Sequence, residues 1–462
     1  MKTSITIALL TAGSLSLCAQ STLSAVWMQR GHRFGTARYN GSAGALAALG
    51  GDGSSSIENP ALMNSSTFGG TEFSTHVRAD QTDLRSQGLG LGQAYMAGAW
   101  RLNSKARLSV GLAYQRDAWF PNYWIASDQN PQTSAVAGWL TQSNGFSPEQ
   151  LLANGLYDAY VAYMGYLTEV GAGNQYTAYA DGVPAYRQVR FVREQSSTSW
   201  SIPFAIKSEK FSLGVRIERR DGRAQERFTM TESGFNPSGV TKAYQKTVVD
   251  STRWGQWNIR FGVAAQLTDG LRFSAAVQPA STALVQWDYR NRVTPEANSS
   301  ESNLTAFELY DDQEFRYQLP TVAQLGLAQT FGTKAAVSAV WVYHSTVDAL
   351  ISSPLNYYDL GRQMAGELQA HQQFRLGGEY RLNEAWTARG GVQWSESGTV
   401  FDDHSRYQML GLGLGYQERD WGVDLAFNAL RTSGSIHNPG DGQSWDLIAD
   451  QQRGTVTYRA RF

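Results

Sequence analysis

The chain has 462 residues, with 39 basic and 40 acidic side chains, 12% aromatic residues and 46 glycines. The balanced charge argues against nucleic acid as a partner, because phosphate binding requires a basic face. The aromatic content excludes a disordered chain. The negative mean hydropathy excludes a protein built from membrane-spanning helices.

The first residues have the pattern of a secretion signal. A short positive region precedes residues 5–17, an apolar run too short to span a bilayer. We expect residues 1–19 to be a signal peptide, with cleavage as late as residue 25 as an alternative. Cys18 raises the alternative of a lipid anchor, although Leu17 stands where lipoproteins carry a small residue. Cleavage beyond Cys18 leaves a mature chain without cysteine, and so without disulfides or thiolate metal sites.

A stretch of small residues follows, from Arg38 to Leu62. It consists almost entirely of Gly, Ala, Ser and Leu, and it ends at Asn59-Pro60-Ala61. The dipeptide Asn59-Pro60 indicates a sharp turn where a helix cannot continue. Residues 43–49 could form a short helix before that turn.

The rest of the chain alternates between apolar and small or polar side chains, which is the period of a β-strand. These strands are about 10–12 residues long, against roughly five or six in soluble proteins. Aromatic residues lie near strand ends, and short turns alternate with long polar loops. These features predict an all-β fold, a transmembrane antiparallel β-barrel of about 14 strands. The expected strands are 71–79, 91–102, 106–117, 196–207, 210–220, 253–267, 271–281, 315–331, 334–345, 367–382, 385–396, 406–418, 421–431 and 452–462.

The loops of this barrel are expected to alternate in length. With the first strand rising from the periplasm, every short turn falls on the periplasmic side, as in bacterial outer-membrane barrels. The terminal Phe462 also fits these barrels, which usually end in an aromatic residue, and it is the expected contact for the barrel-assembly machinery. The expected long loops are 80–90, 118–195, 221–252, 282–313, 346–366, 397–406 and 432–451.

The longest of these loops, residues 118–195, is an insert rich in aromatic side chains. A helix is predicted to open at Ser147-Pro148, because serine is a good N-cap and proline suits the first helical position. Exposed apolar groups at a cell surface need a reason. They either capture a hydrophobic ligand or pack on the insert itself and over the barrel mouth. The candidate ligand-capture residues are Trp119, Phe120, Tyr123, Trp124, Leu156, Tyr160 and Tyr163.

Catalytic and cofactor motifs are missing from the sequence. The glycine patterns at 88–92 and 411–415 lack the strand–loop–helix context of a phosphate site, and their period of two indicates small residues facing the lumen. The sequence contains neither G-x-S-x-G nor H-E-x-x-H. We therefore expect no enzyme, no cofactor and no metal. The acidic pairs Asp311-Asp312 and Asp402-Asp403 are expected on the surface, where divalent cations could bridge them to lipopolysaccharide.

The small-residue stretch placed before such a barrel resembles the N-terminus of the FadL-type family, outer-membrane transporters for long-chain fatty acids and other hydrophobic compounds. The resemblance is specific over about 25 residues, and the insert at 118–195 is similar to that of the Bacteroidetes branch. The chain departs from the family pattern at Ser42-Ala43, where the family favours Met-Gly, and at Leu62, which follows Ala61 without an intervening Gly. The matching positions include Arg38, Gly41, Gly44, Asp52, Asn59, Pro60 and Ala61.

The resemblance implies a hatch, residues 26–69, folded inside a barrel of residues 70–462. The alternative is a flexible periplasmic leader. Lumen-facing arginines would then either bond the hatch to the wall or bind a carboxylate headgroup, and in either case a buried charge must be paired. The candidates are Arg216, Arg260, Arg375 and Arg389.

The implied function is passive uptake of hydrophobic small molecules across the outer membrane of a Gram-negative bacterium. The ligand would dock on the extracellular loops and diffuse through when the hatch moves. The expected partners are this ligand and the lipid and lipopolysaccharide of the membrane, and the protein is expected to be a monomer. The alternatives are a general porin-like diffusion pore and a surface adhesin or structural barrel.

Overall fold

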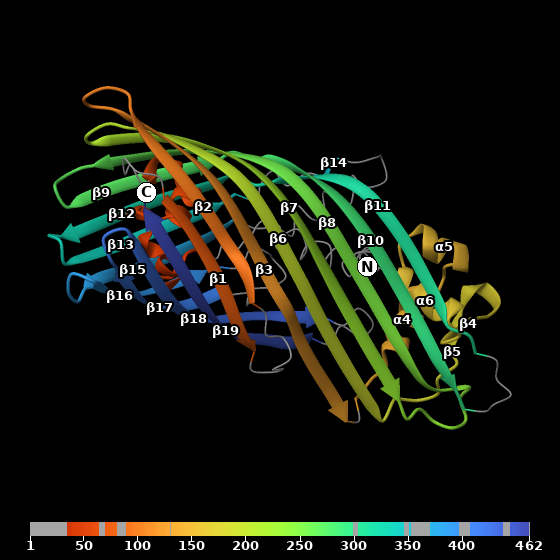
Figure 1. Cartoon of the computed structure of the whole chain (residues 1–462). Helices are drawn as coiled ribbons and strands as arrows, with labels where there is room; N and C mark the ends of the chain where they lie inside the picture. Colours follow the sequence, from red (N-terminus) through yellow and green to blue (C-terminus); the bar gives the residue numbers. More distant parts are fainter. Residues whose placement is uncertain are drawn as a thin grey trace, which may run out of the picture.

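The computed structural model of the chain describes residues 35–63, 70–80, 89–129, 131–298, 304–345, 351–352, 370–396, 407–437 and 444–461. The predicted signal peptide and Phe462 lie outside these residues. Most of the described chain forms one large antiparallel sheet that curves around residues 35–63 (Figure 1).

The sheet has 17 strands, and its ends meet. The first strand pairs with both the second and the last, so the ladder runs round a complete ring. Such a ring leaves no row of unpaired backbone groups at an edge. The strands are β1 (Gly70–Asp80), β2 (Leu89–Arg101), β3 (Arg107–Gln129), β6 (Tyr186–Lys207), β7 (Phe211–Ser233), β8 (Thr241–Gln266), β9 (Leu271–Gln278), β10 (Ser281–Ala297), β11 (Phe307–Leu319), β12 (Val322–Phe331), β13 (Ala335–His344), β14 (Ile351–Ser352), β15 (His371–Arg381), β16 (Trp386–Ser395), β17 (Tyr407–Gln417), β18 (Trp421–His437) and β19 (Ser444–Arg461).

Three passes through the wall are each divided into two strands. β9 and β10 are successive parts of one pass, and both pair with β8. β11 and β12 form the next pass beside them. β13 and β14 form the third, in which β14 pairs with β11. With each of these counted as one, the strands make fourteen passes, as the sequence predicts. The all-β barrel-type fold is thus confirmed.

Two prolines explain the division of neighbouring passes. Proline has no N–H to give to the ladder. Pairing stops after Gln278 and resumes at Ser281, so Pro279 and Pro320 lie in the same gap between the two passes. There the backbone N–H of Ala280 donates to the side chain of Thr321 at 3.2 Å instead.

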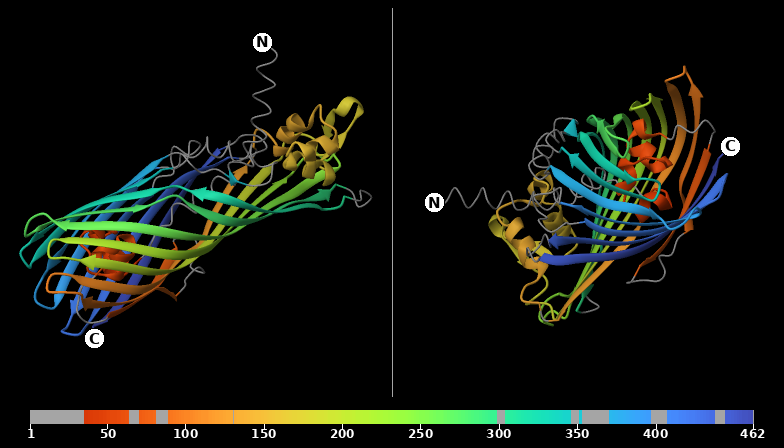
Figure 2. Two further views of the ribbon diagram at one scale, coloured as in Figure 1. Left: turned by 90° about the horizontal axis from the view of Figure 1, so that it is seen from above. Right: turned by 90° about the vertical axis from the view of Figure 1, so that its left-hand side faces the viewer.

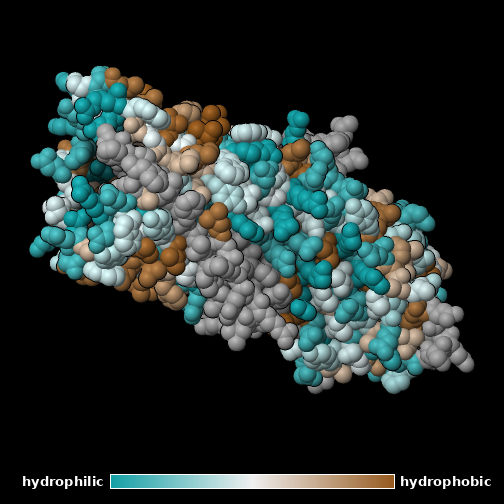
Figure 3. Space-filling view, viewed as in Figure 1, coloured by the Kyte–Doolittle hydropathy of each residue, from teal (hydrophilic) through white to brown (hydrophobic). Residues whose placement is uncertain are grey.

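The strands place apolar side chains outward and polar side chains inward. On β7, Leu213 and Ile217 are 50% and 43% exposed, whereas the alternating Ser212, Arg216 and Glu218 are buried. Exposed tryptophans such as those at 200 and 257 lie where the apolar face ends. In Figure 3 the hydrophobic colour gathers over the half of the molecule with the short turns. The opposite half, on the right of the view, is mostly hydrophilic. This is the outward apolar band expected of a membrane barrel.

Several strands continue far beyond the apolar band, and here the sequence prediction was wrong. Residues 221–252 and 282–313 were expected as loops, but most of them belong to strands, and β8 alone has 26 residues. The expected insert 118–195 is shorter for the same reason, because 118–129 pairs with 186–196 as continuations of β3 and β6. These extensions have polar side chains on the outer face, so they lack the apolar alternation that marks a membrane strand.

The remaining insert is a small helical unit at the end opposite the short turns (Figure 1). A capping box at Ser147 and Gln150 opens its middle helix, at the position that the sequence predicts. Across the described part of the chain, no helix is long and apolar enough to cross a membrane. The elements of the insert are α4 (Ala135–Ser143), α5 (Pro148–Ala153), α6 (Tyr157–Met164), β4 (Thr168–Val170), η4 (Ala172–Asn174) and β5 (Tyr176–Ala178).

Residues 35–63, here called the inner segment, form four short helices on the inner side of the sheet (Figure 2). Side chains cap three of them: Thr36, Asp52 and Asn59 each accept a backbone N–H from the first turn. Pro60 stands at the first position of the last helix, where proline is tolerated. The helices are α2 (Ala37–Gly41), η1 (Ala45–Ala48), α3 (Gly53–Glu58) and η2 (Pro60–Leu62).

Candidate functional site: the inner segment and the barrel wall

The inner segment is hydrogen-bonded to strands all round the barrel. The backbone N–H of Ala37 donates to the hydroxyl of Thr457 at 2.6 Å, and the amide of Asn428 donates to the carbonyl of Asn40 at 2.7 Å. On the other side, the hydroxyl of Ser338 donates to a carbonyl of η1 at 2.7 Å. These contacts satisfy polar backbone groups that the short helices leave open.

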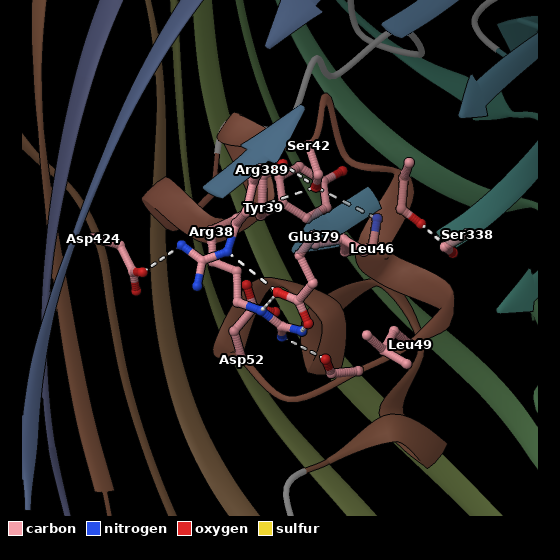
Figure 4. A network of polar contacts seen from close by, with 12 residues as sticks. Arg38, Tyr39, Ser42, Leu46, Leu49, Asp52, Ser338, Glu379, Arg389 and Asp424 are labelled. Atoms are coloured by element: carbon pink, nitrogen blue, oxygen red, sulfur yellow. Dashed lines mark hydrogen bonds and ion pairs between the residues drawn. The ribbon is translucent and has the colours of Figure 1, made fainter. Parts of the chain in front are cut away.

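An ion-pair chain links Arg38 of the inner segment to the wall (Figure 4). Its guanidinium donates two hydrogen bonds to Glu379, at 3.1 and 2.9 Å, and a third to the carbonyl of Gly50 at 2.6 Å. Arg389 bridges the same Glu379, at 3.2 Å, to Asp424, at 2.5 Å. Such paired, charge-assisted bonds are the strong ones, and removing one partner leaves a buried charge uncompensated.

A second buried ion pair joins Glu58 to Arg375. The carboxylate lies 2.8 Å from the guanidinium and also accepts a hydrogen bond from the Tyr39 hydroxyl at 2.6 Å. Burial by itself would raise the pKa of Glu58, but the charge of Arg375 and these hydrogen bonds hold it below its usual value. The amide nitrogen of Gln324 donates a hydrogen bond to the Glu58 carboxylate at 3.4 Å, and its amide oxygen accepts one from Arg260 at 3.4 Å.

A third set of contacts fixes the end of the inner segment at the turn. Arg216 donates to the carbonyl of Ile57 and pairs with Glu218 at 2.9 Å. The amide of Asn59 donates to two wall carbonyls, at 3.1 and 3.3 Å, and Ser212 donates to the carbonyl of Ala61 at 2.7 Å. The turn at Asn59-Pro60 is therefore bonded directly to the neighbouring strands.

Glycines in the wall permit a very close backbone approach. A Cβ added to Gly391 would lie 2.1 Å from the carbonyl oxygen of Ser42, which no real side chain can tolerate. The adjacent Gly390 faces outward, where an added Cβ would meet its nearest neighbour at 3.9 Å. Inside the segment, Gly44 adopts a φ of 77°, which favours glycine. The glycine-rich strand at 411–415 likewise turns small residues toward the inner segment.

The seven predicted hatch residues all belong to the inner segment and are buried. The four predicted arginines all face it: Arg216 and Arg375 bond it directly, whereas Arg389 acts through Glu379 and Arg260 through Gln324. Sequence reasoning did not single out Tyr39 or Glu58. A signal was present, because Glu58 is the only glutamate in a stretch of small residues.

Three of the predicted ligand-capture residues lie together in the helical insert. Leu156, Tyr160 and Tyr163 are half-buried in a hydrophobic cluster of the insert itself. Tyr163 contacts the ring of Tyr176 edge-on, with the ring centroids 5.9 Å apart. The other four, Trp119, Phe120, Tyr123 and Trp124, lie in strand β3 and not in a loop, and their side chains are outside the described part of the structure. Packing within the insert, one of the two interpretations, accounts for the first three.

The insert is held on the inner face of the strand extensions. Glu232 accepts hydrogen bonds from Ser134 at 2.6 Å, Arg187 at 2.7 Å and Tyr244 at 2.8 Å. Around it, Trp139 and other apolar side chains form the largest hydrophobic cluster of the molecule's described residues. Across all the residues that the structure describes, no group of three His, Cys, Asp or Glu side chains could hold a metal ion.

Comparison with solved structures identifies the architecture. The toluene transporter TodX of Pseudomonas putida matches with a TM-score of 0.51 at 13% identity, over 93% of this chain and 99% of that one. A second TodX structure matches with a TM-score of 0.50 at 14% identity, over 93% and 98%. This chain has the TodX fold. A Pseudomonas aeruginosa FadL homologue is also similar, at 11% identity over 92% and 98%, with a TM-score of 0.49.

Comparison at the level of sequence does not detect this similarity. No family model matches the chain, and no curated protein matches it. The resemblance to FadL-type transporters, based on about 25 residues of the N-terminus, is matched at the level of the TodX-like fold.

Proposed function

We propose that the protein resides in the outer membrane of a Gram-negative bacterium and lets hydrophobic small molecules cross it passively. Its apolar outer band and inward polar faces support a place in a lipid bilayer. Its fold is shared with a toluene transporter, and its N-terminus resembles that of transporters for long-chain fatty acids, so aromatic hydrocarbons and fatty acids are the compound classes to test. The lipid and lipopolysaccharide around the barrel, the assembly machinery and a monomeric state belong to the same proposal.

The observation that carries the proposal is the inner segment. It lies inside the ring of strands and is tied by ion pairs and hydrogen bonds to β7, β13, β15, β18 and β19. A general porin needs an open polar lumen and has no use for such a segment. The inner segment is therefore proposed to act as a plug whose movement near Asn59-Pro60 opens the way for the ligand.

One region of the wall is suited to passage. Regular pairing between β3 and β6 is interrupted between Val110 and Ala113, opposite Ile202-Pro203. On the outer face here lies an apolar hollow of about 300 Å³, lined by residues that include Leu112 and Trp200. Behind it, Ile57 of the inner segment packs against the wall. A hydrophobic molecule released from the plug would meet apolar surface on both sides of this gap.

A crosslink across the interrupted ladder is expected to slow transport. The variant Leu112→Cys/Ile202→Cys places two thiols at opposite positions of β3 and β6, and its oxidised form should transport more slowly than its reduced form. Leu108→Cys/Ile206→Cys is the matched control, because those residues pair regularly in the same two strands. Uptake of labelled ligand is measured before and after reduction. Equal rates in both redox states of the first variant would place the route elsewhere.

The proposed function itself is tested by uptake in cells. Cells that produce the protein should accumulate labelled toluene or long-chain fatty acids faster than cells that lack it. Uptake of a polar sugar should not differ between the two. Equal accumulation of every hydrophobic compound would refute hydrophobic uptake, and faster entry of the sugar would favour the porin-like alternative. If cells that lack the protein adhere less well but take up every compound at the same rate, an adhesin would be favoured.

A further inference from the structure

The outer surface of β6, β7 and β8 carries a basic site directly above the apolar band. The last exposed aromatics of the band are Trp200 on β6 and Trp257 on β8, which are 56% and 62% exposed. Arg219 of β7 lies between them in the ladder, with its guanidinium 5.8 Å from the Trp257 ring. Aromatic side chains of this kind mark the level of the lipid headgroups in membrane barrels.

The next outward-facing arginines are opposed across the ladder. Arg223 of β7 and Arg253 of β8 are direct partners, and side chains at such positions lie on one face with their Cβ atoms about 5 Å apart. Both are exposed. Ser196 of β6 is the ladder partner of Arg223 on one side, and Gln286 of β10 is the partner of Arg253 on the other. They form a row of four with the two arginines and add further hydrogen-bonding groups.

Neither arginine of the opposed pair is neutralised. Within the described residues, the only polar side-chain contact of Arg223 is to the Ser196 hydroxyl, at 3.3 Å, and neither Arg223 nor Arg253 has a carboxylate within ion-pair distance. The nearest acid along β7, Asp221, is already paired with Arg219 at 2.5 Å. Like charges directly opposite each other destabilise a sheet unless an anion lies between them.

A polar hollow continues from this row toward the far end of the strands. It has a volume of about 450 Å³ on the same outer face of β6, β7 and β8. Its lining is rich in side chains that hydrogen-bond to hydroxyl groups, including Arg190, Glu194, Gln225, Arg227 and Gln245. The outer face thus presents, in order, apolar side chains, an aromatic row, an unpaired basic row and a polar hollow.

We propose that this surface binds one phosphorylated glycolipid of the outer leaflet. The acyl chains would lie on the apolar band, a phosphate would bind between Arg223 and Arg253 through two-pronged hydrogen bonds, and the sugars would enter the polar hollow. The proposal rests on the membrane location proposed above, but it does not depend on what the barrel transports.

Native mass spectrometry of the purified full-length protein in detergent tests this site. The probes are bisphosphorylated lipid A and the same lipid after removal of its phosphates. The wild-type protein should retain the phosphorylated form preferentially, and Arg223→Gln/Arg253→Gln should lower the retained fraction by about tenfold. The matched control, Arg290→Gln/Arg292→Gln, removes the same charge from the outer face of β10 and should retain lipid like the wild type.

Three results would overturn the proposal. One is equal retention of the two lipids by the wild-type protein, which needs no variant to fold. Another is an equal loss in both double variants, which would indicate general charge attraction. The last is displacement of lipid A by millimolar inorganic phosphate, which would indicate a simple anion site. If lipid A binds as proposed but labelled hydrocarbons do not enter cells faster, only the transport function fails.

Discussion

Deletion of residues 26–69 is expected to convert the barrel into a leaky pore. The inner segment occupies the lumen and supplies partners to Glu379, Arg375 and Arg216, so its loss leaves a wall lined by charged side chains that water will hydrate. Barrels with somewhat more strands and no plug hold an aqueous channel. Liposomes containing the deletion variant should swell quickly in a small sugar, and planar bilayers should show stable conductance.

The deletion result depends on a folded barrel. A shift in gel mobility between heated and unheated samples checks this, because the wall strands pair among themselves round the whole ring. If the folded variant admits sugars no faster than the intact protein, then residues 26–69 do not close the lumen. In that case the plug interpretation is wrong.

The variant Gly391→Val is expected to displace the inner segment without removing it. The new side chain would overlap the carbonyl oxygen of Ser42, since even its Cβ would lie 2.1 Å away. Overpacking of this kind costs about 1–3 kcal/mol when the structure can yield only in part. The segment is the element that can move, because both neighbours of Gly391 in the ladder are fixed by strand pairing. We expect a sugar leak intermediate between the intact protein and the deletion variant.

Gly390→Val is the matched control for this variant. It makes the same chemical change one residue away in β16, on the face that points outward, where the nearest atom would be 3.9 Å from the new Cβ. Its leak rate should equal that of the unmodified protein. Equal leaks in the two valine variants would show that the change disturbs the strand and not the contact with Ser42.

The sequence predicts the part of the fold that lies in the membrane band because burial in lipid imposes a two-residue period. Leu213 and Ile217 alternate with Arg216 and Glu218, and the structure places the first pair outside and the second inside. The same logic predicts fourteen passes. The glycine positions at 411–415 also follow from their period, since small residues are needed where the inner segment touches the wall.

The outer extensions of the strands could not be predicted in this way. Above the band the outer face of β7 and β8 carries polar side chains such as Arg223, Gln225 and Arg253, so these segments lack the outward apolar residues by which a membrane strand is recognised. The sequence also does not show which charged side chains pair with each other. Arg375 was a candidate, but its partner Glu58 is 317 residues away, and only the closed ring brings the two together.

The contact between Ala37 and Thr457 has a consequence for the order of folding. These residues are separated by 420 positions, so a segment near the start of the chain binds to its last strand. Contacts so distant in sequence form late, since the whole intervening chain must be arranged first. Residues 35–63 are made long before the last strands, so we expect their apolar side chains to stay unburied until those strands have paired. A periplasmic chaperone that shields residues 35–63 during this interval would speed maturation, and a free peptide of the same sequence should compete for the finished wall.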